Sequence, residues 1–124
     1  MTIVDSSAWL AYFADEPDAQ HFANAIEAPD FLTVPSITLI DAFKKVAQQR
    51  SEGVALQYVA VIQQGCVVSL DAAVALLVTT LGGHQKMPST DSIIHATAQQ
   101  GNTLVWTQDA DLEDLKSARY FSQT

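Results

Sequence analysis

Apolar residues along this chain follow two patterns: short continuous runs, and longer stretches in which they recur every three to four positions. The short runs predict strands and the longer stretches predict helices. The predicted strands are residues 2–4, 31–34, 66–70 and 103–106, with 120–121 as a candidate for a short last strand. The predicted helices are residues 8–14, 18–28, 36–50, 53–64, 71–81 and 89–100.

Strands and helices alternate along most of the chain, and the predicted strands are apolar at successive positions rather than at every second one. Such strands are typical of a parallel sheet covered by helices on both faces. We therefore predict an α/β fold, a single domain over residues 1–124 with a central, mostly parallel sheet flanked by helices on both faces. In such sheets, ligands bind beyond the carboxyl ends of the strands.

Small residues add local expectations. Gly65 follows a predicted helix in the position that favours a left-handed cap, and Gly82 and Gly83 are expected to end the helix that begins with an Asp71 cap. The single cysteine, Cys66, excludes an internal disulfide and a cysteine-based zinc site. Its apolar neighbours predict a small buried residue.

The net charge of the chain indicates how it could bind nucleic acid. Hydrophobic residues make up 48% of the chain, enough for a folded core, and six Lys or Arg against fourteen Asp or Glu give a net charge of −8. A protein that binds nucleic acid by charge alone should be basic, because Lys and Arg replace counterions on phosphates. Either nucleic acid is not the partner, or another source supplies positive charge, for which a divalent metal is the obvious candidate.

The start of the chain has neither a basic region nor a long apolar stretch. The longest unbroken apolar run, residues 72–78, is far shorter than the roughly 20 residues of a membrane helix. We therefore expect no signal peptide, no membrane span and a cytoplasmic location.

Four acids fall near the carboxyl edge of the predicted sheet. Asp5 follows the first strand, and Asp109 follows the strand at residues 103–106. Asp91 lies in the first turn of the last predicted helix, and Asp41 lies about a turn into the third. Four carboxylates at one edge would raise one another's pKa values, and a hard cation such as Mg²⁺ or Mn²⁺ relieves that repulsion. The four acids therefore predict a metal site.

Each acid also has a purely structural interpretation. Asp5 can cap a helix, and Asp91 can interact with a helix dipole. Asp41 can pair with Lys45 one turn later, and Asp109 can form a turn. The joint placement of the four acids, rather than any single one, favours a metal site.

Four segments contain these acids: residues 3–8 (IVDSSA), 34–41 (VPSITLID), 90–98 (TDSIIHATA) and 104–112 (LVWTQDADL). In this order and spacing they resemble the PIN-domain nucleases, most of all the small VapC-type toxins of bacterial toxin–antitoxin pairs. The resemblance extends over nearly the whole chain. It implies a Mg²⁺- or Mn²⁺-dependent endoribonuclease that hydrolyses phosphodiester bonds in RNA and acts as a toxin.

The resemblance also implies roles for individual residues. Asp5, Asp91 and Asp109 match the family's metal-binding acids, and Asp41 occupies the position of its second catalytic acid. Residues with a supporting role are Ser7, Thr107 and Asp111, the last of which can also be a turn former. The family usually has Glu where this chain has Asp41, a side chain shorter by about 1.5 Å. Because Mg²⁺ often keeps several waters, the shorter carboxylate can act through one of them.

Basic residues flank two of the acids. Lys44 and Lys45 follow Asp41, and Lys86 precedes Asp91. They are either ordinary solvated lysines or contacts to RNA phosphates. His95, four residues after Asp91, is either a partly buried structural histidine or a hydrogen-bonding group near the site.

The first two helices are rich in aromatic residues. Trp9, Tyr12, Phe13 and Phe22 occur within fourteen positions, interleaved with acids. A small domain has a limited interior, so some of these rings are expected at an exposed patch that forms an interface. Together with the resemblance, this predicts a twofold homodimer. The resemblance further implies a small antitoxin that lies along the active-site groove. We predict that it places an Arg or Lys near Asp5 and Asp91, where this cation would compete with the metal.

Two other functions remain open at this point. One is a catalytically weak PIN fold that only binds RNA or a protein, which the Asp41 departure allows. The other is a receiver-like signalling domain, which has similar length and acids beyond parallel strands. Against a receiver, the first strand is not followed by a pair of acids, and no lysine stands in a suitable place after a late strand.

Overall fold

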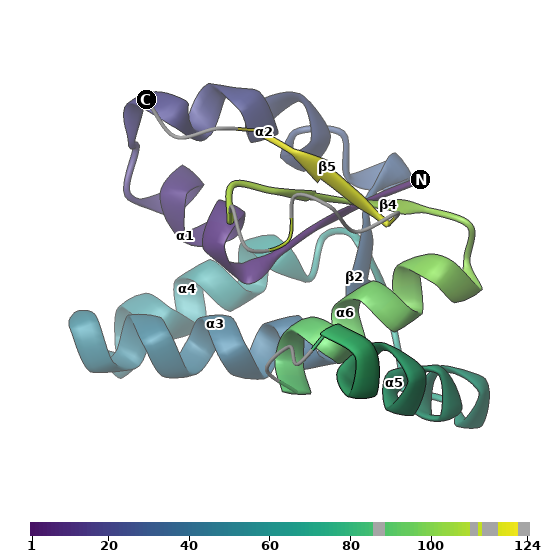
Figure 1. The fold of residues 1–124 in the computed structure, drawn as a ribbon. Coiled ribbons are helices and arrows are strands. Elements are labelled where there is room, and N and C mark those ends of the chain that lie inside the picture. The colour runs from purple at the N-terminus through teal and green to yellow at the C-terminus, as the bar shows by residue number, and fades with distance from the viewer. Residues whose placement is uncertain (86–88, 110–111, 113–116, 122–124) are drawn as a thin grey trace.

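The computed structural model describes residues 1–85, 89–109, 112 and 117–121. Its helices are α1 (Ser6–Phe13), α2 (Gln20–Ile26), α3 (Ser36–Gln49), α4 (Glu52–Ile62), α5 (Ala72–Gln85) and α6 (Ser89–Gln100). Its strands are β1 (Thr2–Val4), β2 (Thr33–Pro35), β3 (Cys66–Val68), β4 (Leu104–Thr107) and β5 (Ala118–Tyr120). Two short 3₁₀ helices, Pro17–Ala19 and Pro29–Phe31, precede α2 and β2 (Figure 1).

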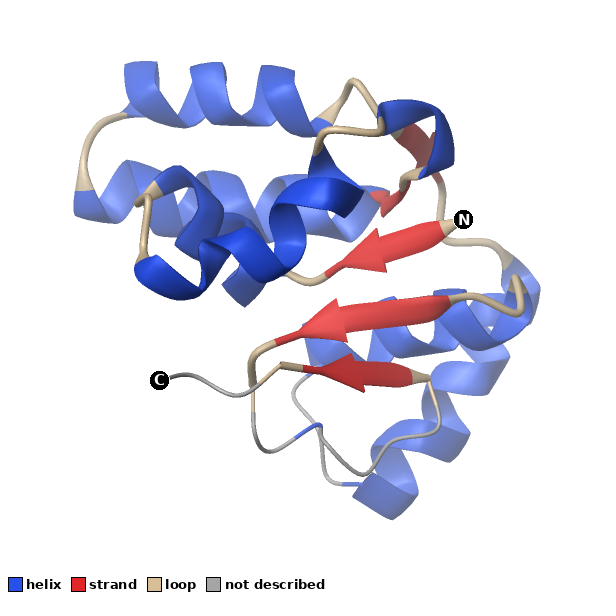
Figure 2. Ribbon diagram, turned by 90° about the horizontal axis from the view of Figure 1, so that it is seen from above, coloured by secondary structure: helices blue, strands red, loops and turns tan. Residues whose placement is uncertain are grey.

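All strand pairs are parallel. One sheet has the order β1-β4-β5, and a second pairs β2 with β3. A parallel bridge between Thr2 and Leu32 joins the two, so that the strands follow one another as β3-β2-β1-β4-β5. In Figure 2 the three strands of the first sheet run side by side in one direction. Their carboxyl ends, and therefore the residues that follow them, meet at one edge.

Helices cover both faces of the sheet, as predicted. On β1, Val4 packs with Trp9 and Phe22 from α1 and α2, whereas its neighbour Ile3 packs with Ile94 from α6. Successive side chains of a strand point to opposite faces, so both faces of β1 are buried. Figure 1 shows α1 and α2 on one side of β4 and β5, and α5 and α6 on the other.

The aromatic residues of the first two helices divide between the interior and the surface. Trp9 and Phe22 are fully buried, and Tyr12 and Phe13 are half-buried against the same core. Phe13 stacks on Tyr58 of α4 with ring centroids 4.0 Å apart. Trp9 and Phe22 are therefore core residues, whereas Tyr12 and Phe13 keep part of their surface exposed, so an interface that includes these two rings stays a prediction.

Three of the local expectations are also wrong. No glycine in the described part of the chain has a positive φ, and α5 continues through Gly82 and Gly83. Gly65 is needed for close approach, since a Cβ there would lie 3.0 Å from the carbonyl oxygen of Leu32. Cys66 is exposed because β3 is the edge strand of the sheet.

Other local expectations hold with small shifts. The side chain of Asp71 accepts a hydrogen bond from the backbone N–H of Val74, so it caps α5 as predicted. The second strand begins at Thr33 rather than two residues earlier, because Phe31 belongs to the 3₁₀ turn at Pro29–Phe31 and Leu32 forms only an isolated bridge to Thr2. Within the described residues, no helix is both long enough and apolar enough to cross a membrane.

Candidate functional site

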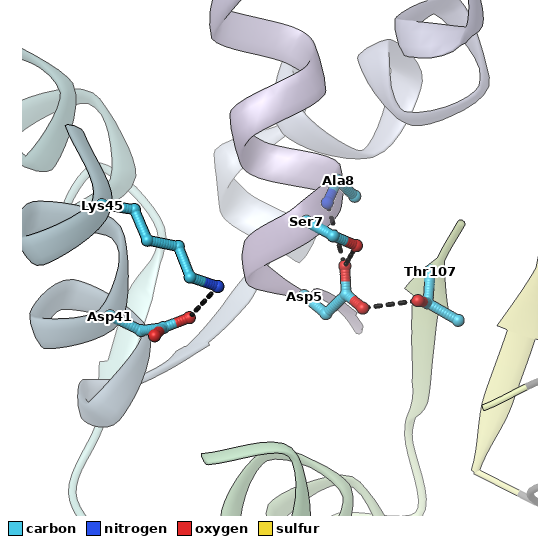
Figure 3. Close-up of polar contacts among 6 residues, drawn as sticks. All are labelled: Asp5, Ser7, Ala8, Asp41, Lys45 and Thr107. Atoms are coloured by element: carbon cyan, nitrogen blue, oxygen red, sulfur yellow. Dashed lines mark hydrogen bonds and ion pairs between the residues drawn. The ribbon is translucent and has the colours of Figure 1, made fainter. Parts of the chain in front are cut away.

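Asp5 lies between the end of β1 and the start of α1, and it is 3% exposed. Its Oδ1 accepts hydrogen bonds from the backbone N–H of Ala8 at 3.0 Å and from the hydroxyl of Ser7 at 2.9 Å (Figure 3). The bond from Ala8 makes Asp5 the N-cap of α1, as its structural interpretation proposed. The cap fixes one oxygen of the carboxylate at the carboxyl edge of the sheet.

Thr107 holds the other oxygen of Asp5. The buried Thr107 hydroxyl donates to Oδ2 of Asp5 at 2.5 Å and accepts from the backbone N–H of Asp109 at 3.0 Å. The backbone N–H of Asp5 also donates to the carbonyl of Trp106, which continues the β1–β4 pairing. One threonine at the end of β4 therefore connects the first predicted acid to the last.

The carboxylates act on one another electrostatically. Burial raises the pKa of Asp91 to about 6, and the charges of Asp5, Asp109 and Asp41 add to that rise while Lys45 opposes it. Burial also raises the pKa of Asp5, and Asp109 adds to it, against hydrogen bonds from Thr107, Ala8 and Ser7 that lower it. The fold thus brings all four predicted acids into one electrostatic cluster, which we call the acid cluster: Asp5, Asp41, Asp91 and Asp109.

Asp41 enters the acid cluster from α3, and it is paired with Lys45. The Lys45 Nζ lies 3.1 Å from Oδ2 of Asp41, and the two side chains are 46% and 21% exposed, respectively. The structural interpretation of Asp41 is therefore correct as far as the ion pair goes. It does not exclude a functional role, because the charge of Asp41 also acts on Asp91.

The donor chemistry of the acid cluster suits a hard divalent cation. The oxygen atoms in and beside the acid cluster belong to carboxylates and hydroxyls. A hard divalent cation stabilises buried carboxylates that repel one another. As the described side chains stand, however, no three acidic, histidine or cysteine residues among them are close enough to enclose an ion. The acids would have to draw closer together to ligate one metal.

The remaining predicted site residues fall into three groups. Lys44 is exposed on α3. Asp111 and Lys86 lie outside the described residues. His95 points into the interior, where its Nδ1 lies 2.6 Å from the Oγ of Ser117 and burial lowers its pKa to about 4. For His95, the interpretation as a structural histidine fits the structure.

The structure adds polar groups that the sequence analysis missed. Four buried side chains each have an oxygen with no hydrogen-bond partner among the described residues: Ser6, Thr38, Ser92 and Gln108. Ser6, Ser92 and Gln108 are the immediate neighbours of acids in the sequence, and Thr38 lies one turn before Asp41. Buried polar atoms normally find a partner. The only sequence signal for them is the run of small polar residues beside each acid.

A groove lies between α1, the last turns of α3, and α4. It has a volume of about 300 Å³, and Ser7, whose hydroxyl bonds to Asp5, is among its lining residues. Farther from Ser7 in the sequence, Val46, Arg50 and Tyr58 also line it. Ser7 therefore links this groove to Asp5, although no member of the acid cluster is among its lining residues.

Comparison with solved structures places the fold among toxin–antitoxin proteins. The chain matches a chain of a toxin–antitoxin complex from Klebsiella pneumoniae with a TM-score of 0.81 at 16% identity, covering 99% of this chain and 100% of that one. It matches VapBC2 from Rickettsia felis bound to a promoter DNA fragment with a TM-score of 0.76 at 10% identity, covering 98% and 97%. It matches DNA-bound VapBC from Salmonella typhimurium with a TM-score of 0.76 at 15% identity, covering 98% of this chain and 96% of that one.

At these identities the likeness shows a shared fold. No curated protein matches the chain in sequence. The family model of the PIN domain, in contrast, matches residues 2–117, nearly the whole chain. With its parallel sheet and its acids at the carboxyl edge, this chain belongs to the PIN domain family.

Proposed function

We propose that this protein is a divalent-metal-dependent endoribonuclease and the toxin of a toxin–antitoxin pair. The observation that carries the proposal is the geometry at the carboxyl edge, where Thr107 bonds to both the Asp5 carboxylate and the Asp109 backbone, and the raised pKa of Asp91 is consistent with acids gathered there. A PIN domain that concentrates carboxylates in this way at the carboxyl edge of its sheet has the donors that a hydrolytic metal site requires.

In this proposal, Asp5, Asp91 and Asp109 hold Mg²⁺ or Mn²⁺. When bound, the ion supplies positive charge that orients a water for attack on the phosphodiester and stabilises the leaving oxygen. Ser7 and Thr107 fix the orientation of the Asp5 carboxylate through their hydrogen bonds. This matters because catalytic groups tolerate only about 0.5 Å of misplacement.

Other residues take auxiliary roles in the proposal. Asp41 acts as the second acid, through a water because its side chain is one methylene shorter than Glu. Asp111 is an auxiliary acid, and Lys44, Lys45 and Lys86 are candidates for contacts to RNA phosphates. The basic side chains matter because the net charge of −8 otherwise repels RNA.

An antitoxin is the proposed protein partner. Several solved structures that share this fold are toxin–antitoxin or VapBC complexes. The groove lined by Ser7, whose hydroxyl bonds to Asp5, is the place we propose for a segment of the partner. An Arg or Lys of the partner would pair with Asp5 and Asp91 there and compete with the metal for the same carboxylates. Replacing the basic residues of the partner with Ala should then weaken inhibition.

A homodimer is proposed as the assembly, with a changed location for its interface. Since Trp9 and Phe22 are internal, the interface would combine the exposed parts of Tyr12 and Phe13 with other exposed apolar side chains, or consist of those other side chains alone. Ile40 on α3, Leu56 on α4 and Leu76 on α5 are 59%, 62% and 72% exposed. Light scattering should report twice the 13.4 kDa mass of one chain, and the single-chain mass at every concentration would refute the dimer.

RNA cleavage tests the enzymatic part of the proposal. The purified protein should cleave single-stranded RNA with Mg²⁺ or Mn²⁺ and stop when EDTA removes the ion, whereas an Asp5→Asn, Asp91→Asn double variant should be inactive in both conditions. Cleavage that persists in EDTA would refute metal dependence. Cleavage by the double variant at the wild-type rate would refute the site.

A non-catalytic PIN domain that binds RNA or protein is the second candidate, and the Asp41–Lys45 ion pair favours it because it engages the second acid. The same experiment separates the two, since this candidate predicts RNA binding without cleavage. A receiver-like domain is set aside, because the PIN family match covers residues 2–117.

A further inference from the structure

A positive charge from the described part of the chain, that of Lys45, acts on the acid cluster. Lys45 approaches it from α3, and in Figure 3 its amino group points toward the side of the site that holds Asp5. Its charge lowers the pKa of Asp91 at the same time as Asp41 raises it. The described arginines are engaged elsewhere: Arg50 donates to the Tyr58 hydroxyl, and Arg119 lies over the Trp106 ring. Lys45 is thus the described cation that acts on the acids.

The Asp41–Lys45 ion pair matters because it lies beside the other acids of the cluster. An exposed ion pair one helical turn apart usually contributes little, because water and salt screen it. Here Asp41 is mostly shielded, and both charges act on the half-buried Asp91. The short Asp41 side chain keeps its carboxylate near its own helix, within hydrogen-bonding distance of the residue one turn later. The ammonium is therefore held beside Asp41, although the Lys45 side chain is 46% exposed.

An ammonium in this position and a divalent cation repel each other. Both are stabilised by the same carboxylates, so the arrival of one weakens the hold of the other. We propose that Lys45 is a built-in counter-ion of the acid cluster, which a divalent cation must displace to bind, so that Lys45 sets the metal affinity of the site. This inference rests on the proposed function, since it takes the ion to bind at Asp5, Asp91 and Asp109.

The proposal predicts the size and sign of a change in affinity. A divalent ion and an ammonium several ångströms apart in a largely aqueous setting repel each other by an amount that corresponds to roughly tenfold in affinity. Removing the ammonium also frees Asp41, which adds negative charge for the ion. Both effects act in the same direction, so Lys45→Met should bind Mn²⁺ about tenfold more tightly than the wild type.

Isothermal titration of the full chain with Mn²⁺, without RNA, tests the proposal. The matched control is Lys44→Met, which removes the same charge from the adjacent, exposed residue and should leave Mn²⁺ affinity within about twofold of the wild type. Lys45→Arg, which keeps the positive charge, should also stay close to the wild type. Circular dichroism checks that each variant is folded, as expected for an exposed helix position.

The outcomes separate this inference from the proposed function. Tighter Mn²⁺ binding by Lys45→Met alone supports the counter-ion. Equal affinities in the wild type, Lys45→Met and Lys44→Met overturn the counter-ion and leave the metal site standing. Weaker binding by Lys45→Met also overturns it, because the lysine would then help to arrange the acids. If neither the wild type nor Lys45→Met binds Mn²⁺, both the inference and the proposed metal dependence are wrong.

Discussion

The Thr107 hydroxyl donates a hydrogen bond of 2.5 Å to the carboxylate of Asp5, a residue 102 positions earlier in the chain. Both side chains are buried, and the same hydroxyl accepts the backbone N–H of Asp109. The Thr107 side chain therefore connects the end of β1 with the end of β4, and Asp5 with Asp109. The geometry of the acid cluster depends on this link.

Replacing Thr107 with Val should destabilise the fold by about 1–3 kcal/mol, because it keeps the side-chain shape but removes the hydroxyl that donates to the buried Asp5 carboxylate. Chemical denaturation measures the change. Thr107→Ser, which keeps the hydroxyl, should lose much less. Thr103→Val is a matched control, since the Thr103 hydroxyl makes only a local bond to Gly101 in an exposed position. Equal losses for Thr107→Val and Thr103→Val would mean that the Asp5 link carries no stability.

The raised pKa of Asp91 predicts a pH dependence of stability. An acid whose folded pKa is about 6, against an ordinary 3.8, binds more protons in the folded state, so its contribution makes the protein less stable as pH rises from about 4 to about 6. The substitution Asp91→Asn removes this loss of stability at higher pH. Without metal, the variant should be more stable than the wild type at pH 7, by about 1–2 kcal/mol after allowance for partial exposure. The gain should vanish below pH 4.

Thermal melting from pH 4 to pH 7 in EDTA checks this prediction. His95 acts in the opposite sense over a similar range, because burial lowers its pKa to about 4 and its stabilising neutral form is lost as pH falls from about 6.5. The difference between wild type and Asp91→Asn, rather than either melting curve alone, isolates Asp91. A difference that stays constant with pH would show that Asp91 does not titrate in this range.

Metal binding should reverse the effect of the clustered charge. An ion that binds only the folded state stabilises it, so Mn²⁺ should raise the melting temperature of the wild type, and more strongly as its concentration increases. Asp5→Asn combined with Asp91→Asn should abolish the rise. An unchanged Mn²⁺ response in the double variant would place the ion elsewhere.

Substitutions of Asp41 test whether its short side chain contributes to the metal site. If a water bridges its short side chain to the metal, Asp41→Glu should increase RNA cleavage or metal affinity, because the longer carboxylate comes closer to the ion. Asp41→Asn should reduce both, since it removes the charge and releases Lys45 from its partner. Cleavage assays under matched metal concentrations measure these effects. If all three proteins behave alike, Asp41 is not part of the site.

Local patterns in the sequence were sufficient for the architecture and for the approximate position of the acids. Ile3 and Val4 are apolar at successive positions, which requires a strand buried on both faces and hence helices on both sides. An acid directly after such a strand must lie at the carboxyl edge, as Asp5 does. The Asp71 cap was predictable for the same reason, because capping involves only residues within one turn.

Contacts between distant segments were decided only by the tertiary structure. Periodicity shows that Trp9 has a buried side, but not whether its neighbour is another helix of the chain or a second molecule. Cys66 is exposed because β3 has no strand beyond it, and Gly65 is required because β2 passes within contact distance. The direction in which the Lys45 side chain points was also decided by the tertiary structure. The sequence places it one turn after Asp41, but α3 must dock beside α1 and α6 before its ammonium can act on Asp91.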